Sequence, residues 1–561
     1  MSNRVLAISV TAVAGLAASA IAQPDSNARW GSYKAGQLMQ GSVDAAAGPA
    51  TNLEWTLNGV QPVAAGGITI GSDGMLYFQT RSTVEQPRVY KVDPANGNVL
   101  AVSPFLPGNT GTYASPAHAV NGLWTAVSQN PSGPWESSII RLNYSDLSIA
   151  QTITDPALDP NPDTAGLRGA PLIGTVNNQR GNVNLYVHMR GAGSFPGGLI
   201  HAVDSVTGDV DWSYDPLLGN TTFFGFIGPG WVSGGRYHIA HFGNQAVSGG
   251  VCVRDNADGT WTEVWFGGPD NFNWMGTGAM NDSSTTMYVT TFNDGDTPSM
   301  WAVNAATGAQ NWSVPGRRGT IHELNFFARA SVKGNRVYAC GGAGVITAFD
   351  DHGGSYTQPW VLRPTAIPDP NNPDAFAAPT NTRAAWATEQ DFFNAGEITA
   401  YTVVDVVGRG GASERLIYAV MQQQNQDPGL GSDPFTAQFI VVRDEGSTAT
   451  ELFRTTLNNT MIPTRFGNST AAVDEDGNVY VAGGSPSATA GANGQVYKFS
   501  PAGAPPCPCD RNGDDICDFF DVQNFLAAFS AQNPSADINN DGIFDFFDVQ
   551  AYLNIFSAGC P

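Results

Sequence analysis

The stretch that decides the fold is Leu199–Trp212, LIHAVDSVTGDVDW. Its alternating apolar residues predict a strand, the pair Thr207–Gly208 predicts a tight turn, and a second strand ends at the final tryptophan. A close copy, MWAVNAATGAQNW, lies at Met300–Trp312. Weaker copies follow the same plan at Val89–Leu100, Val251–Trp265, Val345–Trp360, Phe439–Phe453 and Val496–Gly503. The chain therefore uses one hairpin many times.

A second kind of hairpin precedes each of these copies, with a short first strand, a Gly or Asx turn, and a strand that contains an aromatic residue. The units repeat at about fifty residues, and longer near the end, with four strands in each. This period is typical of β-propeller blades. The markers of the successive units are Ala65, Ser115, Ala170, Gly228, Thr277, Arg329, Thr399 and Thr470. We predict an all-β, eight-bladed propeller, with seven blades as the alternative because the unit near Thr399–Met421 is irregular.

The closure of the ring is also predicted from the sequence. The last hairpin ends at Val496–Gly503 without a fourth strand, whereas Leu53–Leu57, LEWTL, is a lone strand near the amino end. If this strand becomes the outer strand of the final blade, the ring has no unpaired edge at the join. We therefore expect the two ends of the propeller to pair.

The two full hairpin copies share a pattern that resembles the tryptophan-docking motif of pyrroloquinoline quinone (PQQ)-like propeller repeats. The residues are Ala202, Asp204, Thr207, Gly208 and Trp212 in one copy, and Asn304, Thr307, Gly308 and Trp312 in the other. The resemblance covers roughly residues 53–503 and implies that Trp212 and Trp312 pack between neighbouring blades. It also raises PQQ as a cofactor. However, quinoprotein alcohol dehydrogenases carry a disulfide between adjacent cysteines over the cofactor, and this chain has no adjacent cysteines.

A duplicated unit follows the linker 504–509 and fills residues 510–561. Each copy has oxygen ligands at loop positions 1, 3, 5, 9 and 12 and a carbonyl at position 7, the spacing that wraps Ca²⁺. The first set is Asp510, Asn512, Asp514, Asp518 and Asp521 with the carbonyl of Ile516. The second is Asp537, Asn539, Asp541, Asp545 and Asp548 with the carbonyl of Ile543. We predict two calcium ions, the first held more weakly because Asp515 stands where Gly542 supplies a positive φ.

A helix is predicted after each loop, because apolar residues recur at i, i+3, i+4 and i+7. They are Val522, Phe525, Leu526 and Phe529 in the first, and Val549, Tyr552, Leu553 and Phe556 in the second. The pair of loop–helix units resembles a type I dockerin, a calcium module by which extracellular bacterial proteins bind cohesin receptors. Aspartate at position 12 fits the dockerin pattern.

The dockerin resemblance also implies which residues contact the partner. Loop positions 10 and 11 contribute to cohesin binding in dockerins, and here they are Phe519-Phe520 and Phe546-Phe547. One phenylalanine of each pair could instead pack in the core of the module. Adjacent positions on a helix are about 100° apart and a module this small has little interior, so we expect at least one of each pair to be exposed.

The amino end carries an export signal. Residues 1–22 have Arg4, then an apolar run, then the small-residue sequence Ala20-Ile21-Ala22, typical of a secretory signal peptide cleaved after Ala22. The apolar run is shorter than the roughly 20 residues of a spanning helix. We expect a secreted protein, extracellular or cell-surface associated, with no transmembrane segment after signal removal and with residues 23–52 as an amino-terminal segment.

Charge and cysteine usage narrow the function further. The chain has 26 basic and 49 acidic residues and a net charge of -23, which excludes a nucleic-acid partner. An exported chain can oxidise its cysteines, and we expect a bridge from Cys507 or Cys509 to Cys560, with Cys517 taking the other. Cys252 and Cys340 fall in blades that are not neighbours, so we interpret them as buried thiols.

No catalytic or cofactor-binding residue is predicted. Haem, zinc-protease and serine-hydrolase motifs are absent from the sequence. His322, Glu323 and Arg329 lie where a loop enters the sixth blade, and we interpret them as ordinary loop polarity. The leading hypothesis is a non-catalytic binding or scaffold propeller attached through its dockerin to a cohesin-bearing surface or complex. The alternatives are a PQQ-dependent dehydrogenase and a carbohydrate-active component of a polysaccharide-degrading assembly, with a polysaccharide or cell-surface ligand.

Overall fold

The computed structural model describes most of the strands and helices of the chain. The described residues are 23–26, 28, 40, 42–60, 67–80, 87–107, 110–111, 115–129, 136–155, 158, 167–189, 199–215, 230–241, 249–267, 278–290, 300–314, 330–340, 346–362, 397–407, 413–424, 435–457, 471–483, 494–501, 509, 511, 518–533, 536, 538 and 543–558.

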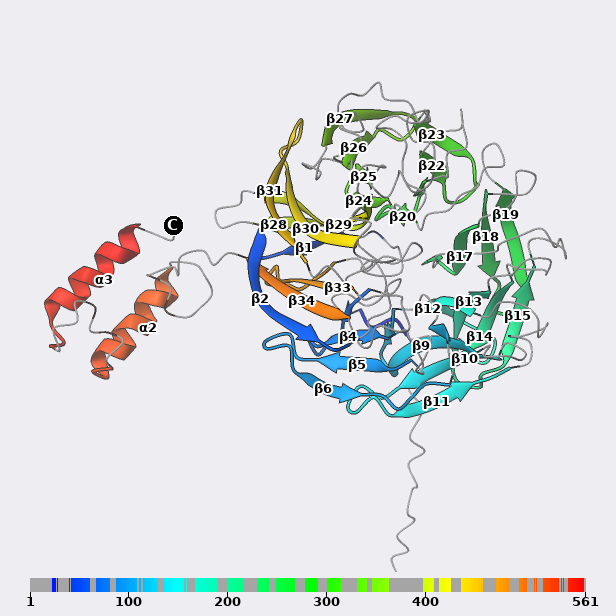
Figure 1. The fold of residues 1–561 in the computed structure, drawn as a ribbon, viewed down its shortest axis with the longest axis horizontal. Coiled ribbons are helices and arrows are strands. Elements are labelled where there is room, and N and C mark those ends of the chain that lie inside the picture. Colours follow the sequence, from blue (N-terminus) through cyan, green and yellow to red (C-terminus); the bar gives the residue numbers. More distant parts are fainter. Residues whose placement is uncertain are drawn as a thin grey trace, which may run out of the picture.

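Eight antiparallel sheets form the blades, arranged around a common centre in chain order (Figure 1). Blade 1 contains β3 (Thr69–Ile70), β4 (Leu76–Gln79), β5 (Val89–Val92) and β6 (Val99–Val102). Blade 2 contains β7 (Thr110–Gly111), β8 (Ala117–Ala119), β9 (Gly122–Gln129), β10 (Glu136–Leu142) and β11 (Ile149–Ile153). Blade 3 contains β12 (Leu167–Asn177), β13 (Val183–Met189), β14 (Ile200–Asp204) and β15 (Val210–Tyr214). Blade 4 contains β16 (Trp231–Ser233), β17 (Arg236–His241), β18 (Gly249–Asp255) and β19 (Trp261–Gly267).

Blade 5 contains β20 (Ala279–Met280), β21 (Thr286–Thr290), β22 (Met300–Asn304) and β23 (Gln310–Val314). Blade 6 contains β24 (Ser331–Lys333), β25 (Arg336–Cys340), β26 (Ile346–Asp351) and β27 (Tyr356–Leu362). Blade 7 contains β28 (Glu397–Val407), β29 (Ser413–Gln424), β30 (Phe435–Asp444) and β31 (Ala449–Thr456). Blade 8 contains β32 (Ala472–Val473), β33 (Val479–Gly483) and β34 (Gln495–Pro501). The prediction of eight blades is confirmed, and the seven-bladed alternative is wrong.

The predicted closure of the ring is confirmed. Strand β2 (Ala50–Asn58) pairs antiparallel with β34, so it is the outer strand of blade 8, and Trp55 lies opposite Lys498. The sequence did not predict β1 (Ser42–Ala45), which pairs parallel with β28 at the inner edge of blade 7. The amino-terminal segment therefore adds strands to two adjacent blades.

The tryptophans of the fourth strands contact the next blade, as the docking motif implies. Trp312 of β23 donates its indole N–H to Asp351 of blade 6 at 2.7 Å, and Trp265 of β19 donates to the carbonyl of Ala305 of blade 5 at 3.0 Å. Trp55 closes the series, because its indole N–H reaches the carbonyl of Pro94 in blade 1 at 3.0 Å. Trp212 is buried in one apolar cluster with residues of blade 4.

The turn that receives each tryptophan is built by the other residues of the motif. The side chain of Asp204 accepts hydrogen bonds from the backbone N–H groups of Val206 and Thr207, and Asn304 does the same in its own turn. Gly308 follows with φ of +72°, and a Cβ there would lie 2.8 Å from the ring of Trp265. The glycine is required both by its backbone conformation and by the closeness of the tryptophan.

Buried tyrosines on the second strands make a further contact between blades. Tyr288 donates to Asp351 at 2.5 Å, and Tyr338 donates to Asp444 at 2.6 Å, in each case across to the next blade. Asp444 also accepts from the indole of Trp360 at 2.9 Å and from Arg336 at 2.9 Å. One carboxylate at the turn of a blade thus receives both aromatic donors of the preceding blade.

Two helices, α2 (Phe519–Ser530) and α3 (Phe546–Ala558), form the carboxy-terminal module and lie side by side in Figure 1. The ring of Phe525 stacks on that of Tyr552, with centroids 4.1 Å apart and planes 10° apart. Both residues are buried. The predicted pair of packed helices is therefore present.

We expect the substitution Gly308→Ala to destabilise the propeller much more than Gly334→Ala. Both glycines have positive φ, which costs alanine about 1–2 kcal/mol, but a Cβ at Gly334 meets nothing within 4 Å. The clash with Trp265 adds about 1–3 kcal/mol at position 308. Thermal unfolding followed by tryptophan fluorescence measures the difference. Equal shifts of the two variants would contradict the close docking of Trp265.

Acid should weaken the contact at Asp444. Burial by itself raises the pKa of this carboxyl, but the hydrogen bonds from Tyr338 and Arg336 outweigh it, so the pKa lies below its ordinary value. A carboxyl whose pKa is lower in the folded state stabilises the fold above the unfolded pKa of about 3.9, and this contribution disappears as the pH falls through the folded pKa. We expect Asp444→Asn to unfold more easily at pH 7 but to lose less stability on acidification. If the free energy of unfolding falls by the same amount in the two proteins between about pH 5 and pH 2.5, the pKa of Asp444 is not lowered by folding.

Candidate calcium-binding module

The aspartates at position 12 hold the two ends of each predicted calcium loop together. Asp521 accepts the backbone N–H of Arg511 at 2.7 Å and that of Asp518 at 2.9 Å. In the second repeat, Asp548 accepts from Ile538 at 2.9 Å and from Asp545 at 3.0 Å. Each carboxylate therefore joins loop position 2 to loop position 9, and both are fully buried.

The aspartates at position 9 begin the helices. Asp518 is the N-cap of α2, and its side chain accepts the backbone N–H of Phe520 at 2.8 Å. Together with Asp521 it forms a reciprocal capping box. Asp545 makes the equivalent bond to the backbone N–H of Phe547 at 2.8 Å. The two repeats thus have the same geometry in their described parts.

The interior of the module ties the first loop to the second helix. Tyr552 donates its hydroxyl to the backbone carbonyl of Cys509 at 2.9 Å, and Cys509 is buried and disulfide-bonded. The guanidinium of Arg511 lies 5.5 Å from the ring centroid of Tyr552 and 5.9 Å from that of Phe525. These contacts fix the loops against a core of a few aromatic rings.

Five of the predicted calcium ligands belong to the described residues: Asp518, Asp521, Ile543, Asp545 and Asp548. The other seven lie outside them: Asp510, Asn512, Asp514, Ile516, Asp537, Asn539 and Asp541. In the part of the chain that the structure describes, three or more His, Cys, Asp or Glu side chains do not come together as a metal site. The described ligands fit calcium in their chemistry, because they are hard oxygen donors and a buried carboxylate is costly without a partner of opposite charge.

All four phenylalanines at positions 10 and 11 are exposed. The exposed fractions are 68% for Phe519, 61% for Phe520, 69% for Phe546 and 61% for Phe547. The rings of each pair meet edge to face at 6.4 and 6.3 Å. We expected at least one phenylalanine of each pair to be exposed, and both members of each pair are. Their role in partner binding stays a prediction.

Both predicted helices are present, but one leucine of the apolar pattern in each lies at the surface. Leu526 and Leu553 do not face the interior; their exposed fractions are 45% and 48%. The two helices meet along a narrow line centred on Phe525 and Tyr552, so the next residue around each helix is left outside. These leucines follow Phe519 and Phe546 by seven residues, or about two helical turns, and so lie on the same helix face as these phenylalanines.

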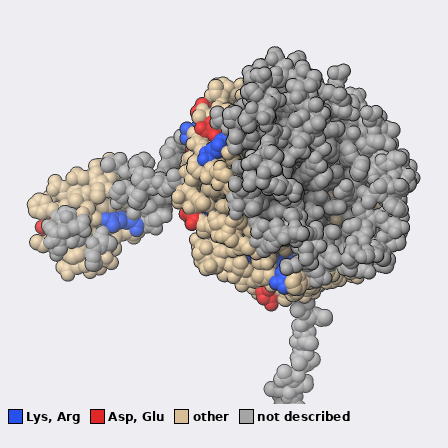
Figure 2. All heavy atoms as spheres, in the orientation of Figure 1, with Lys and Arg blue, Asp and Glu red and all other residues tan. Residues whose placement is uncertain are grey.

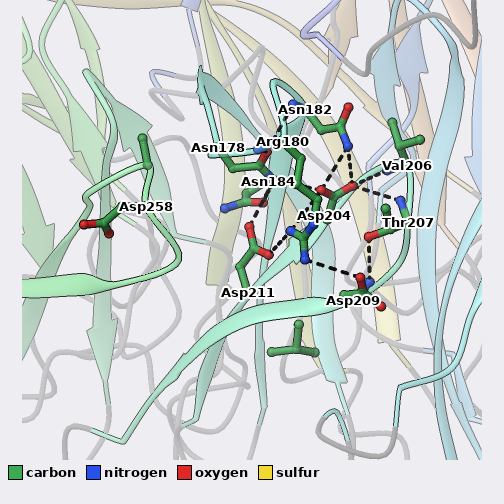
Figure 3. A network of polar contacts seen from close by, with 12 residues as sticks. Asn178, Arg180, Asn182, Asn184, Asp204, Val206, Thr207, Asp209, Asp211 and Asp258 are labelled. Carbon is green, nitrogen blue, oxygen red and sulfur yellow. Dashed lines mark hydrogen bonds and ion pairs between the residues drawn. The ribbon is translucent and has the colours of Figure 1, made fainter.

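Figure 3 draws a network of polar side chains on blade 3. Arg180 pairs with Asp204, Asp209 and Asp211, and the amide of Asn178 donates to Asp204 at 2.9 Å and to Asp211 at 3.0 Å (Figure 3). Burial raises the pKa of Asp211, whereas hydrogen bonds from Asn182 and the backbone of Thr207 outweigh burial and lower the pKa of Asp204. The residues joined by dashed lines in Figure 3 belong to blade 3, and Asn184 also donates to Asp255 of blade 4 at 2.8 Å, so the cluster braces the docking turn of blade 3 and bonds to the next blade.

One cysteine–histidine pair is present, but it is not a catalytic dyad. The Cys252 sulfur lies 3.8 Å from Nε2 of His238. Burial raises the pKa of the thiol to about 12 and lowers the pKa of the imidazole to about 3, so both groups are neutral at pH 7. Cys252 is a free, buried thiol as predicted. The side chain of Cys340, and His322, Glu323 and Arg329, lie outside what the structure describes.

No family model matches the chain, and no curated protein sequence matches it. Among solved structures, quinohemoprotein alcohol dehydrogenase ADHIIG from Pseudomonas putida HK5 is similar with a TM-score of 0.46 and 12% identity, covering 85% of this chain and 81% of that one. The quinohemoprotein alcohol dehydrogenase from Comamonas testosteroni has a TM-score of 0.38 and 12% identity, with the same coverages. Sqt1 from Saccharomyces cerevisiae has a TM-score of 0.38 and 9% identity, covering 66% of this chain and 96% of that one.

The fold defines the chain as an eight-bladed β-propeller followed by a small two-helix module. The described helices include none long and apolar enough to cross a membrane. On the face shown in Figure 2, the acidic and basic side chains of the described residues lie singly or in small groups and do not form one broad patch.

We expect the full chain to bind two calcium ions and to lose one with each position-12 substitution. Asp521→Ala and Asp548→Ala remove the carboxylate that joins the two ends of a loop, so each should abolish one site. Calorimetric titration of the metal-free protein with calcium measures the number of sites. Asp209→Ala, which changes an exposed carboxylate on blade 3, is the matched control. Binding of two ions by the Asp521→Ala, Asp548→Ala double variant would contradict the assignment.

The first site should be the weaker one. Asp515 occupies the position at which calcium loops of this type need a positive φ, and the second loop has Gly542 there. Asp515→Gly should therefore tighten the first site severalfold and leave the second unchanged. The same titration, with Asp548→Ala present to isolate the first site, gives the comparison. An unchanged affinity would show that position 6 of this loop is not strained.

Proposed function

We propose that the chain is an exported propeller protein held by its carboxy-terminal dockerin-like module, in a calcium-dependent way, on a cohesin-bearing surface or extracellular complex. The observation that carries this proposal is the match between the described parts of the two loop–helix repeats. Buried Asp521 and Asp548 each bond loop positions 2 and 9, and exposed phenylalanine pairs begin the helices. A calcium loop places these pairs next to the ion. Calcium would then set the orientation of the surface that the partner contacts.

The exposed apolar residues support a protein partner. Phe519, Phe520 and Leu526 are exposed in the first repeat, and their counterparts in the second repeat are exposed to nearly the same degree. Exposed aromatic rings grouped with an aliphatic side chain are typical anchors of protein–protein interfaces. The duplication presents this surface twice, so either repeat could bind the partner.

The propeller part would act as the binding or scaffold module of the protein. In a four-stranded antiparallel blade, the connections from strand 2 to strand 3 and from strand 4 to the next blade open on one face of the ring. These connections include the longest of the chain, such as residues 363–396 between β27 and β28. The opposite face carries short turns, such as the one that joins β24 to β25. Because functional residues gather on loops held by a rigid scaffold, we assign ligand binding to the long-connection face.

The amino-terminal segment occupies the other face. Gln40 accepts the backbone N–H of Val332 through its carbonyl at 3.0 Å, and Ser42 donates to the carbonyl of Val332 at 2.6 Å. Further on, the N–H of Ala46 reaches the carbonyl of Glu475 in the first turn of blade 8 at 2.7 Å. The described residues of this segment therefore lie along the turn ends of blades 6, 7 and 8.

A quinone-dependent dehydrogenase and a carbohydrate-active propeller are the alternatives. A PQQ titration followed by absorbance tests the dehydrogenase, and a glycan array tests the carbohydrate-active propeller. Our proposal predicts that PQQ causes no saturable spectral change, since the chain lacks the adjacent cysteines that cover the cofactor in quinoprotein alcohol dehydrogenases. A stoichiometric spectral change together with alcohol oxidation would replace the scaffold proposal by the dehydrogenase.

Substitution of the phenylalanine pairs tests the attachment. We expect replacement of either Phe519-Phe520 or Phe546-Phe547 by Ser-Ser to leave capture of the envelope receptor largely intact, because the repeats are equivalent. Replacement of both pairs should abolish capture while calcium binding persists. Pull-down from the envelope fraction of the source organism in calcium measures this, with Val99→Ser on blade 1, an exposed apolar position outside the module, as the control. Undiminished capture by the four-fold variant would contradict the proposed surface.

A further inference from the structure

Residues 23–25 add a short strand to the first hairpin of blade 2. The carbonyl of Gln23 accepts the backbone N–H of Val120 at 2.9 Å, and Pro24 forms an antiparallel bridge with Ala119. The N–H of Asp25 then donates to the carbonyl of His118 at 3.1 Å. Residues 23–25 are thus bonded to blade 2.

The side chain of Asp25 extends this contact to blade 1. Its Oδ2 accepts the hydroxyl of Ser72, in the turn between β3 and β4, at 2.6 Å. The amino-terminal strand therefore spans the turn ends of two blades, as residues 40–46 do on the other side of the ring.

The predicted cleavage point lies directly before this strand. Cleavage after Ala22 leaves Gln23 as the first residue of the mature chain. A chain cleaved there would begin with a residue of the bonded strand, and Gln23 would be the amino-terminal residue of the folded, mature protein.

We infer that Gln23 becomes pyroglutamate after cleavage, which rests on the export signal of the proposed function. The free α-amine attacks the side-chain amide carbon of the same residue, a C–N bond forms, the bond to the amide nitrogen breaks, and ammonia leaves. No oxidant, cofactor or second substrate is needed. The product is a neutral five-membered lactam, so the positive charge of the chain end is lost.

The geometry of the strand permits this reaction. Gln23 is exposed, so its side chain is free to turn back toward its own amine. The reaction uses the α-nitrogen and the side-chain carbonyl carbon, whereas the strand is held through the main-chain carbonyl of Gln23 and through residues 24 and 25. Cyclisation therefore leaves every described contact of the strand in place.

The modification would protect the amino-terminal strand. Aminopeptidases need a free α-amine, and removal of Gln23 would take away the carbonyl that binds Val120. A lactam at position 23 prevents the first cleavage. The strand that joins blades 1 and 2 would thus be preserved in an extracellular medium that contains peptidases.

Mass spectrometry of the full chain, produced with its own residues 1–22 in a secreting host and collected after export, tests the inference. We expect the amino-terminal peptide to begin at residue 23, to weigh about 17 Da less than the linear peptide, and to resist amine-reactive labels. Gln23→Ala, which has no side-chain amide, is the control and should be labelled at its α-amine. Gln23→Glu should cyclise far more slowly, because water and not ammonia must leave.

The outcomes separate the modification from export. A chain that begins at a linear, labelled Gln23 after prolonged incubation at neutral pH overturns the pyroglutamate and leaves export standing. A chain that begins at another residue, or that keeps residues 1–22, overturns both. A blocked chain in wild type with a labelled Gln23→Ala variant supports the inference.

Discussion

The docking of one blade's aromatic side chains onto the next blade's turn is the contact on which the ring depends. A four-stranded blade has two apolar faces and cannot bury either by itself. Trp312 and Tyr288 both donate to Asp351 of the following blade, and Trp360 and Tyr338 both donate to Asp444. Each donor pair crosses a blade boundary, so the hydrogen bonds fix the spacing and rotation of neighbouring blades while the rings fill the space between them.

The same constraint explains how the ring is closed. The last blade needs a fourth strand with a tryptophan that can reach blade 1, and the amino end supplies it as β2, with Trp55 bonded to Pro94. Residues before β2 are held as well, by β1 along blade 7 and by Gln23–Asp25 on blades 1 and 2. The described residues before β2 are therefore bonded to the ring.

The sequence predicted the features that depend on residues close together in the chain. Alternation, turn residues and the repeat period predicted eight blades, and the missing fourth strand of the last unit predicted the pairing of Leu53–Leu57. The spacing of apolar residues after each loop predicted the two helices. Strand β1 was missed because Ser42–Ala45 has no strong pattern and pairs with a strand more than three hundred residues further on. The bonds from tyrosine to aspartate were missed for the same reason, since donor and acceptor lie in different repeats. Leu526 and Leu553 belong to the apolar pattern and are nevertheless exposed, because helical periodicity gives a face and not the width of the core.

In the function that we propose, the module at the carboxy end holds the chain on its receptor and the propeller is the binding or scaffold part. Calcium-dependent release from intact cells of the source organism tests this account most directly, with the protein detected by antibody before and after treatment with a calcium chelator. The account predicts that the chelator releases the full chain from the cell surface, that calcium restores binding, and that a chain truncated after residue 503 is found in the medium from the start. Retention of the full chain in chelator, or surface binding of the truncated chain, would contradict it.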